Sequence, residues 1–249
     1  MSSLSRRSFM SGLAASGAAV GLAGCVTGPL AQRPILQAQP MPQLADLEAG
    51  PVDQASFYAA IHDDKFNVPA VDLKRVGKAF LRAEIDYQTD EAPGTIIIDT
   101  QAHYLYHVLG GGRAMRYGVG VGREGFVWAG TANIHSKQEW PDWYPPKEMI
   151  ERQPELKAKM STLQSGIGMH GGPGNPLGAR AMYLWQGNKD TLFRIHGTVE
   201  PWTIGKSVSS GCIRMINQDV MNLYQTVEIG AKVIVNGPGM ALAEALPTG

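Results

Sequence analysis

One stretch near the C-terminal end carries most of the information about fold and function: residues 194–215 read RIHGTVEPWTIGKSVSSGCIRM. Its chemistry centres on His196 and Cys212. A cysteine attacks as a thiolate, and its ordinary pKa is about 8.5, so it needs a base or a positive charge nearby. His196 ends a predicted strand, and the intervening loop is rich in glycine and serine, so it could bring the two residues together. The stretch therefore predicts a nucleophilic cysteine with a histidine base.

The residues next to this pair offer the other groups that acyl transfer requires. Ser210, Gly211 and Cys212 read as a tight turn. Backbone N–H groups of such a turn could hold the oxyanion of a tetrahedral intermediate. Arg214 adds a positive charge that could lower the thiol pKa or hold a substrate carboxylate.

The full string is similar to the signature of the L,D-transpeptidases, the YkuD-like catalytic domain. The similarity rests on His196-Gly197-Thr198, Pro201-Trp202-Thr203-Ile204-Gly205 and Ser209 to Met215. It continues upstream in residues 96–100, 118–122 and 172–178, and so extends over residues 93–237. The resemblance implies a mainly β, sandwich-like domain with one or two helices.

The resemblance also implies a role for each residue of the signature. Cys212 would be the nucleophile and His196 its general base, with the backbone of Gly197 orienting the imidazole in place of a triad aspartate. Ser210 and Gly211 would form the oxyanion turn, and Arg214 matches the arginine that follows the family nucleophile. Many relatives have His or Arg at the position of Ser210, so any contribution from that side chain is missing here.

Further contacts to substrate are expected from residues around the signature: Asn175, Thr198, Ser209, Trp202 and His170. Two of these have a second interpretation. Asn175 could instead initiate a turn before Pro176, and His170 could be an exposed loop residue.

The implied substrate is the tetrapeptide stem of peptidoglycan. Cys212 would attack the carbonyl of the third residue, D-alanine would leave, and a side-chain amine of another stem would resolve the thioester into a 3→3 cross-link. Resolution by water would make the protein an L,D-carboxypeptidase, and a protein amine would make it a wall-anchoring enzyme. All three activities share one acyl-enzyme, so the signature does not separate them. Carbapenems are expected to acylate Cys212, and no metal or organic cofactor is expected.

A non-catalytic wall-binding lipoprotein is the alternative from a different class. A missing cysteine or histidine would have favoured it, and both residues are present. A papain-like protease is disfavoured because there the cysteine precedes the histidine.

The N-terminus resembles an export signal. Arg6 and Arg7 precede an uncharged run of small and apolar residues over 12–23, which is typical of a twin-arginine signal. Leu22-Ala23-Gly24-Cys25 resembles a bacterial lipobox, so lipidation at Cys25 is expected, the alternative being an ordinary cleaved signal. The sequence thus predicts a periplasmic lipoprotein that faces the cell wall and contacts the membrane only through Cys25.

Composition limits the remaining possibilities. The chain has 249 residues, 44% of them hydrophobic and 18% charged, which is enough to bury a core. Because 22 basic residues balance 22 acidic ones, the net charge does not favour a nucleic-acid-binding function. Two cysteines exclude a disulfide scaffold and a four-cysteine zinc site.

The domain organisation follows from composition and periodicity. Residues 1–24 are the signal, 25–55 a flexible Pro/Gln-rich spacer, 56–92 a prelude packed on the main domain, 93–237 the catalytic domain and 238–249 a tail. Strands are expected over 94–99, 104–109 and 115–121 as an antiparallel meander, and over 182–185, 192–196 and 232–235. Residues 146–160 suggest a helical insertion, Asn217 the N-cap of a helix, and Val71, Val76, Phe80 and Leu81 one face of a short helix.

Overall fold

The computed structural model describes residues 53–123, 128–145, 147–209 and 211–237. The predicted export signal, Cys25, the predicted spacer up to residue 52, Ser210 and the predicted tail lie outside these ranges. The fold below is that of the described residues within the unit Pro51–Gly249. Within the described ranges, no helix combines the length and apolar character that crossing a membrane requires.

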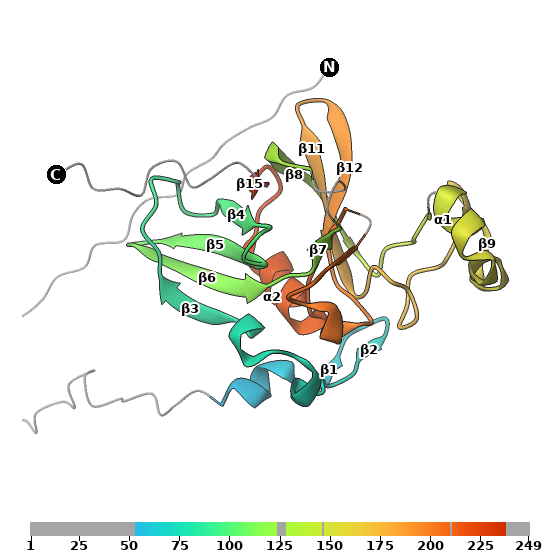
Figure 1. Cartoon of the computed structure of the whole chain (residues 1–249), viewed down its shortest axis with the longest axis horizontal. Coiled ribbons are helices and arrows are strands. Elements are labelled where there is room, and N and C mark those ends of the chain that lie inside the picture. Colours follow the sequence, from blue (N-terminus) through green and yellow to red (C-terminus); the bar gives the residue numbers. More distant parts are fainter. Residues whose placement is uncertain (1–52, 124–127, 146, 210, 238–249) are drawn as a thin grey trace, which may run out of the picture. The chain divides into compact units, whose positions relative to one another are not determined.

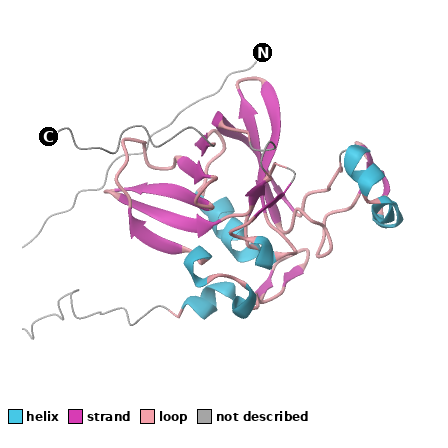
Figure 2. Ribbon diagram, viewed as in Figure 1, coloured by secondary structure: helices cyan, strands magenta, loops and turns pink. Residues whose placement is uncertain are grey.

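The framework is a nine-stranded sheet in the order β14-β12-β11-β8-β15-β4-β5-β6-β3 (Figures 1 and 2). The predicted mainly β fold is confirmed, and hydrogen bonding runs without a break from one edge of this sheet to the other. The bounds of its strands are β3 (Ala83–Asp86), β4 (Ile96–Asp99), β5 (Tyr104–Gly110), β6 (Arg113–Gly118), β8 (Gly130–Glu139), β11 (Arg180–Gln186), β12 (Lys189–His196), β14 (Ile213–Arg214) and β15 (Lys232–Asn236).

The centre of the sheet forms from short β-branched runs. Ile96, Ile97 and Ile98 of β4 are all buried, as expected of a strand that is covered on both faces. β4, β5 and β6 pair antiparallel in sequence order, so the predicted meander is confirmed. β15 runs parallel to β4 and antiparallel to β8, and thereby joins the meander to the second half of the sheet.

Helix α2 (Asn217–Thr226) lies between the two halves of the sheet (Figure 1). Its buried Val220 and Leu223 belong to the main core with residues of β4, β5, β8, β11, β12 and β15. On one side Tyr117 of β6 donates a hydrogen bond to Asn222 at 2.7 Å. On the other, Lys137 of β8 donates to the carbonyls of Tyr224 and Val227 at the helix C-terminus, where a positive charge is favourable.

The start of α2 corrects one prediction. Asn217 is the first helical residue rather than the N-cap, which is Ile216 and has no side-chain cap. The Asn217 side chain instead accepts a hydrogen bond from the backbone N–H of Ala179 at 3.0 Å. It therefore ties the helix to the start of β11, a tertiary contact that local sequence does not reveal.

The predicted insertion is more varied than one helix. Residues 146–160 hold two helical elements, α1 (Lys147–Arg152) and the 3-10 helix η5 (Pro154–Lys159). The antiparallel pair β9 (Ser161–Leu163) and β10 (Gly166–Gly168) follows directly. In Figure 1 these elements stand to the right of the sheet.

The prelude is a chain of short elements that packs on the sheet and on α2. It comprises η2 (Gln54–Tyr58), the hairpin β1 (Ile61–His62) and β2 (Asn67–Val68), η3 (Leu73–Arg75), η4 (Lys78–Phe80) and β3. The predicted single helix is wrong, because its residues fall in and around two 3-10 helices. Its apolar side chains nevertheless share one cluster: Val76 and Leu81 are buried with Tyr58, Ile204 and Ile216, and Val71 and Phe80 pack against them.

A nearly buried ion pair fixes the hairpin of the prelude. Asp63 accepts two hydrogen bonds from the Arg180 guanidinium, at 2.9 and 3.0 Å, and one from Trp140 Nε1. These hydrogen bonds, first among them those from Arg180, lower the pKa of Asp63. The hairpin is thereby attached to β11 and to the end of β8.

Candidate active site

Two parallel strands bring the predicted nucleophile and base together. β12 ends at His196, β14 begins one residue after Cys212, and their register pairs Ile195 with Ile213 and His196 with Arg214. Ile195 and Ile213 are both buried in the core. Because side chains alternate along a strand, His196 and Arg214 share the opposite face, and Cys212 approaches that face next to Arg194. The pairing explains how residues far apart in sequence form one site.

His196 is buried and its ring is oriented by a backbone carbonyl. Nδ1 lies 2.6 Å from the carbonyl oxygen of Gly197. A carbonyl only accepts, so Nδ1 carries the proton of the neutral ring and Nε2 keeps a lone pair. Burial, with help from the charges of Arg214 and Arg194, lowers the pKa of His196 to about 4. The ring is therefore neutral at pH 7 and able to accept a proton at Nε2.

Cys212 is half-buried and is not an activated thiolate in this state. Burial raises the pKa of the thiol above its ordinary value. A backbone N–H interaction with Arg194 and the charges of Arg194 and Arg214 act in the opposite direction and offset part of that effect. A protonated thiol beside a neutral imidazole is the arrangement that general-base activation requires.

The turn before Cys212 is held closed by Ser209. Its hydroxyl donates to the carbonyl of Cys212 at 2.7 Å and accepts the N–H of Gly211 at 3.2 Å. The Gly211 amide therefore has an acceptor within the turn in the free protein, and its part in an oxyanion hole stays a prediction. Ser209 is buried and acts within the turn rather than as an exposed substrate contact. Ser210 lies outside the described residues.

β7 (Val121–Gly122) and β13 (Ser207–Ser209) form a parallel pair that carries this turn. Arg123 N–H donates to the carbonyl of Ser209 at 3.1 Å. The glycine-rich segment over 118–122 thus supports the turn rather than contributing side chains to it.

Gly197 occupies a place where a side chain does not fit. A Cβ there would lie 2.1 Å from Asn217 Oδ1 and 3.1 Å from the backbone nitrogen of Ala179. The backbone N–H of Gly197 donates to the carbonyl of Arg180 at 3.0 Å. The residue that orients His196 is therefore itself fixed against β11 and α2.

Two arginine–carboxylate pairs flank Cys212. Arg214 lies 3.4 Å from Glu200 Oε2, and its backbone exchanges hydrogen bonds with Gly120 at 2.9 and 2.8 Å. Arg194 makes two hydrogen bonds of 2.8 Å to Asp190 and lies over the ring of Tyr183. Arg194, Asp190 and Glu200 were missed from the sequence. Strand alternation could have suggested Arg194, because it precedes His196 by two residues and so shares its face.

Asn175 and His170, two of the predicted substrate contacts, lie in opposite environments, one buried and one exposed. Asn175 is 1% exposed, donates to the carbonyls of Pro141, Met169 and His170, and accepts the N–H of Leu177. Its amide groups are thus used inside the turn, which is its second interpretation. The His170 side chain is 73% exposed, with Nδ1 3.7 Å from Asp142 Oδ1, as expected of a loop histidine.

Trp202 and Thr198 lie on the segment that follows His196. Trp202 belongs to η6 (Pro201–Thr203), and the guanidinium of Arg75 from the prelude covers its ring at 3.8 Å. Thr198 is buried, and its hydroxyl accepts the N–H of Glu200 at 3.1 Å. Both residues therefore shape this segment through contacts within the protein.

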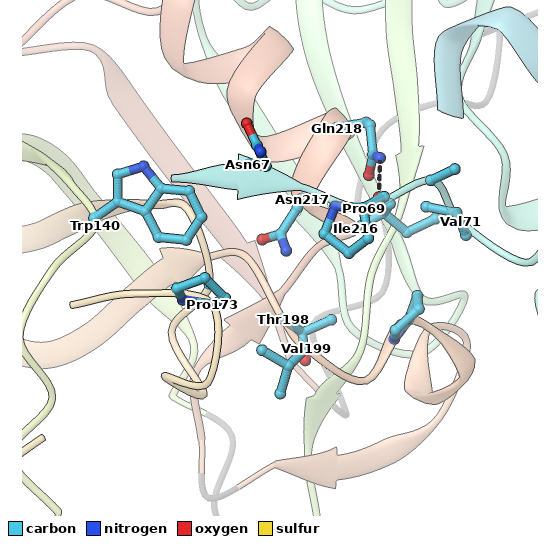
Figure 3. Close-up of a pocket in the computed structure, with 13 residues that line it drawn as sticks. Asn67, Pro69, Val71, Trp140, Pro173, Thr198, Val199, Ile216, Asn217 and Gln218 are labelled. Carbon is cyan, nitrogen blue, oxygen red and sulfur yellow. Dashed lines mark hydrogen bonds between the residues drawn. The ribbon is translucent and has the colours of Figure 1, made fainter. Parts of the chain in front are cut away.

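A cavity of about 160 Å³ lies next to this segment (Figure 3). The prelude forms one wall, and the segment after His196 together with the start of α2 forms another. The lining residues are Asn67, Pro69, Ala70, Val71, Trp140, Pro173, Gly178, Thr198, Val199, Pro201, Ile216, Asn217 and Gln218. The prelude thus lines a cavity whose other wall includes Thr198, which follows His196 by two residues in the sequence.

Comparison with protein families gives one clear match. The model of the YkuD family, described as the L,D-transpeptidase catalytic domain, matches residues 93–235. Among curated proteins, the probable L,D-transpeptidase YbiS of Escherichia coli K12 is 29% identical over 156 residues, covering 61% of this chain and 47% of YbiS. The chain spans about half the length of the curated relatives it matches.

Solved structures give two further likenesses. A crystal structure described as a probable carnitine operon oxidoreductase from Brucella melitensis is 50% identical, covers 66% of this chain and 99% of its own, and has a TM-score of 0.43. An L,D-transpeptidase from Mycobacterium smegmatis is 19% identical, covers 57% of this chain and 58% of its own, and has a TM-score of 0.41.

Proposed function

The chain belongs to the family of L,D-transpeptidase catalytic domains, and from this premise we propose that it cross-links peptidoglycan stems through a thioester on Cys212. The observation that supports the proposal is the pairing of β12, which ends at His196, with β14, which begins one residue after Cys212. The hydrogen bond to the Gly197 carbonyl further supports a neutral His196 with its proton on Nδ1. Family membership supplies the substrate class, and the site supplies a nucleophile and a base.

The proposed reaction has two acyl transfers. His196 Nε2 takes the thiol proton as Sγ attacks the carbonyl of the third stem residue, and then gives that proton to the nitrogen of the departing D-alanine. The amine of an acceptor stem next attacks the thioester, loses a proton to His196, and the thiol is restored. Of the three turn residues whose amides are expected to hold the oxyanion, Ser210 lies outside the described residues. The Gly211 amide donates to Ser209, and the Cys212 amide has no acceptor among the described residues.

Two related activities use the same acyl-enzyme. Water as acceptor would give an L,D-carboxypeptidase, and an amine on a protein would give an anchoring enzyme. A wall-binding protein without catalysis is the alternative from another class. Binding alone would not require Cys212 and His196, so their presence favours the enzyme.

Intact mass spectrometry tests these proposals. The full chain carrying Cys25→Ser, in which Cys212 is the single thiol, is incubated with a disaccharide-tetrapeptide, with Cys212→Ala as the matched control. A Cys212-dependent dimer that has lost one D-alanine supports cross-linking, and a tripeptide monomer supports the carboxypeptidase. Carbapenem acylation without turnover points to a different acceptor, and neither reaction points to the wall-binding protein.

We also propose that the protein is exported and anchored by a lipid at Cys25. The support is the Arg6-Arg7 pair and the lipobox-like residues 22–25. The mass of the mature N-terminal peptide tests this: a diacylated Cys25 supports the anchor, and cleavage at another site contradicts it. Loss of membrane association in Cys25→Ser is the matched control.

A further inference from the structure

The two arginine–carboxylate pairs beside Cys212 are not equivalent. Asp190 holds Arg194 through two contacts of 2.8 Å, with side chains 32% and 16% exposed. Glu200 holds Arg214 through one contact of 3.4 Å, and its side chain is 47% exposed. Arg194 is therefore fully engaged, whereas Arg214 keeps guanidinium N–H groups that a second carboxylate could reach.

The backbones of Arg214 and Glu200 are fixed, so only their side chains can exchange partners. Arg214 is the register partner of His196 and is held by Gly120 on its other side. The N–H of Glu200 donates to Thr198 Oγ1, and its carbonyl accepts both the N–H and the hydroxyl of Thr203. A ligand carboxylate at Arg214 would thus lie beside the general base without moving the strands.

We propose that Glu200 is a specificity-determining residue: it occupies Arg214 in the free protein and yields that guanidinium to the terminal carboxylate of the donor stem. This inference rests on the proposed function and names the feature of the substrate that the site recognises. A guanidinium prefers a bidentate carboxylate, so a ligand that makes two short contacts replaces the single contact of 3.4 Å favourably. When D-alanine leaves with its carboxylate, Glu200 returns and favours release of the product.

The test compares a tetrapeptide stem with its analogue in which the D-alanine carboxylate is a carboxamide. Because Glu200 competes only with an anion, Glu200→Gln is expected to lower KM for the acid several-fold and to change kcat/KM for the amide by less than twofold. Arg214→Gln is expected to abolish the preference of the enzyme for the acid over the amide. Glu228→Gln, a charge removal in the exposed turn after α2, is the matched control and should keep the wild-type preference.

Each outcome has a distinct meaning. If Glu200→Gln leaves KM for the acid unchanged while the wild type turns over both stems, the inference is overturned and the proposed function stands. If Arg214→Gln slows both stems equally, Arg214 acts on the thiol and not on the carboxylate, which also overturns it. If the wild type turns over neither stem, the proposed function fails and this inference fails with it.

Discussion

Burial favours the neutral forms of the two candidate reactive groups, His196 and Cys212, in the free protein. Burial moves the pKa of His196 down to about 4 and the pKa of Cys212 up, and both shifts disfavour a resting thiolate–imidazolium pair. Arg194 acts in part against this, but Asp190 compensates its charge through two short hydrogen bonds. The reactivity of the thiol therefore depends on a carboxylate that does not touch it.

Removal of the Asp190 charge should expose this dependence. In Asp190→Asn the charge of Arg194 is no longer compensated, so the pKa of Cys212 should fall and iodoacetamide labelling at pH 8 should be roughly threefold to tenfold faster. Arg194→Gln should slow labelling. The measurement is the labelling rate against pH in the Cys25→Ser background, and an unchanged midpoint in both variants would contradict the electrostatic explanation.

The tight fit at Gly197 should appear as coupling between two residues. Gly197→Ala would place a methyl group 2.1 Å from Asn217 Oδ1. We expect a loss of about 1–3 kcal/mol in the free energy of unfolding from overpacking, together with lower activity because His196 loses its orientation. Asn217→Ala should restore part of that stability in the double variant. A double-mutant cycle measured by urea unfolding checks this, and strict additivity of the two effects would argue against the contact.

Among the secondary-structure elements, those with a clear local sequence pattern could be predicted. β4, β5, β6 and β15 were identifiable because they are β-branched runs between turns. β8 was missed, although it is the longest strand, because Gly130–Glu139 alternates small and polar residues around the buried Ala132 and Ile134. In the same way, motif spacing predicts that His196 and Cys212 share a site, and β12 and β14 are indeed adjacent strands. The Glu200 and Asp190 ion pairs could not, because they depend on how the turns and the bulge of β12 fold.

The bulge in β12 stores strain at an exposed residue. Leu192 has φ of 64° and is 75% exposed, and the register of β12 against β11 shifts at this point. The bulge brings Asp190 and Arg194 side by side. Because glycine tolerates this conformation, Leu192→Gly should be about 1 kcal/mol more stable than Leu192→Ala, which keeps the strain. Thermal unfolding of both variants checks this, and a less stable glycine variant would show that the backbone is not strained.

Asp219 of α2 makes stability depend on pH. It is fully buried, accepts a hydrogen bond from Tyr58 at 3.2 Å, and lies 3.9 Å from Arg82, while Oδ1 has no hydrogen-bond partner. Burial raises its pKa to about 7 from 3.8. Between these values the folded protein holds a proton that the unfolded chain has released, so this group lowers stability as pH rises from about 4 to about 7.

Asp219→Asn should remove that loss. The variant should gain Tm relative to wild type at pH 8 and differ little at pH 5, because the native carboxyl is protonated at pH 5 and resembles the amide. Thermal unfolding at the two pH values measures the difference. Asp86→Asn, at a side chain that is 87% exposed, serves as control and should show no such change. A gain of the same size at both pH values would exclude ionisation of Asp219 as its cause.

For the molecule as a whole, the prelude belongs to the catalytic unit even though the family match begins at residue 93. Three contacts attach it to η6, α2 and β11: Arg75 covers Trp202, Tyr58 donates to Asp219, and Asp63 pairs with Arg180. The prelude also forms one wall of the cavity beside Thr198. A change in the prelude should therefore affect substrate binding as well as stability.

The pair of Asp63 with Arg180 is the point at which this can be tested. The two side chains are 15% and 8% exposed. Asp63→Ala would leave a nearly buried guanidinium and the Trp140 N–H without their main acceptor. Arg180 would keep its hydrogen bond to the carbonyl of Ala179 at 2.9 Å and Glu139 at 3.8 Å. We expect a loss of about 2–3 kcal/mol in the free energy of unfolding, measured with urea.

The kinetics of Asp63→Ala distinguish two roles of the prelude hairpin, one in stabilising the fold and one in binding the substrate. If the prelude is part of the substrate surface, Asp63→Ala should raise KM for the tetrapeptide while kcat stays within about twofold, because His196 and Cys212 are held by β12 and β14 and not by the hairpin. The matched control is Asp64→Ala, at the exposed neighbouring position. If the two variants have equal kinetics although Asp63→Ala is less stable, the hairpin only stabilises the fold. A hairpin that contacts the substrate would change KM when its attachment to Arg180 is lost.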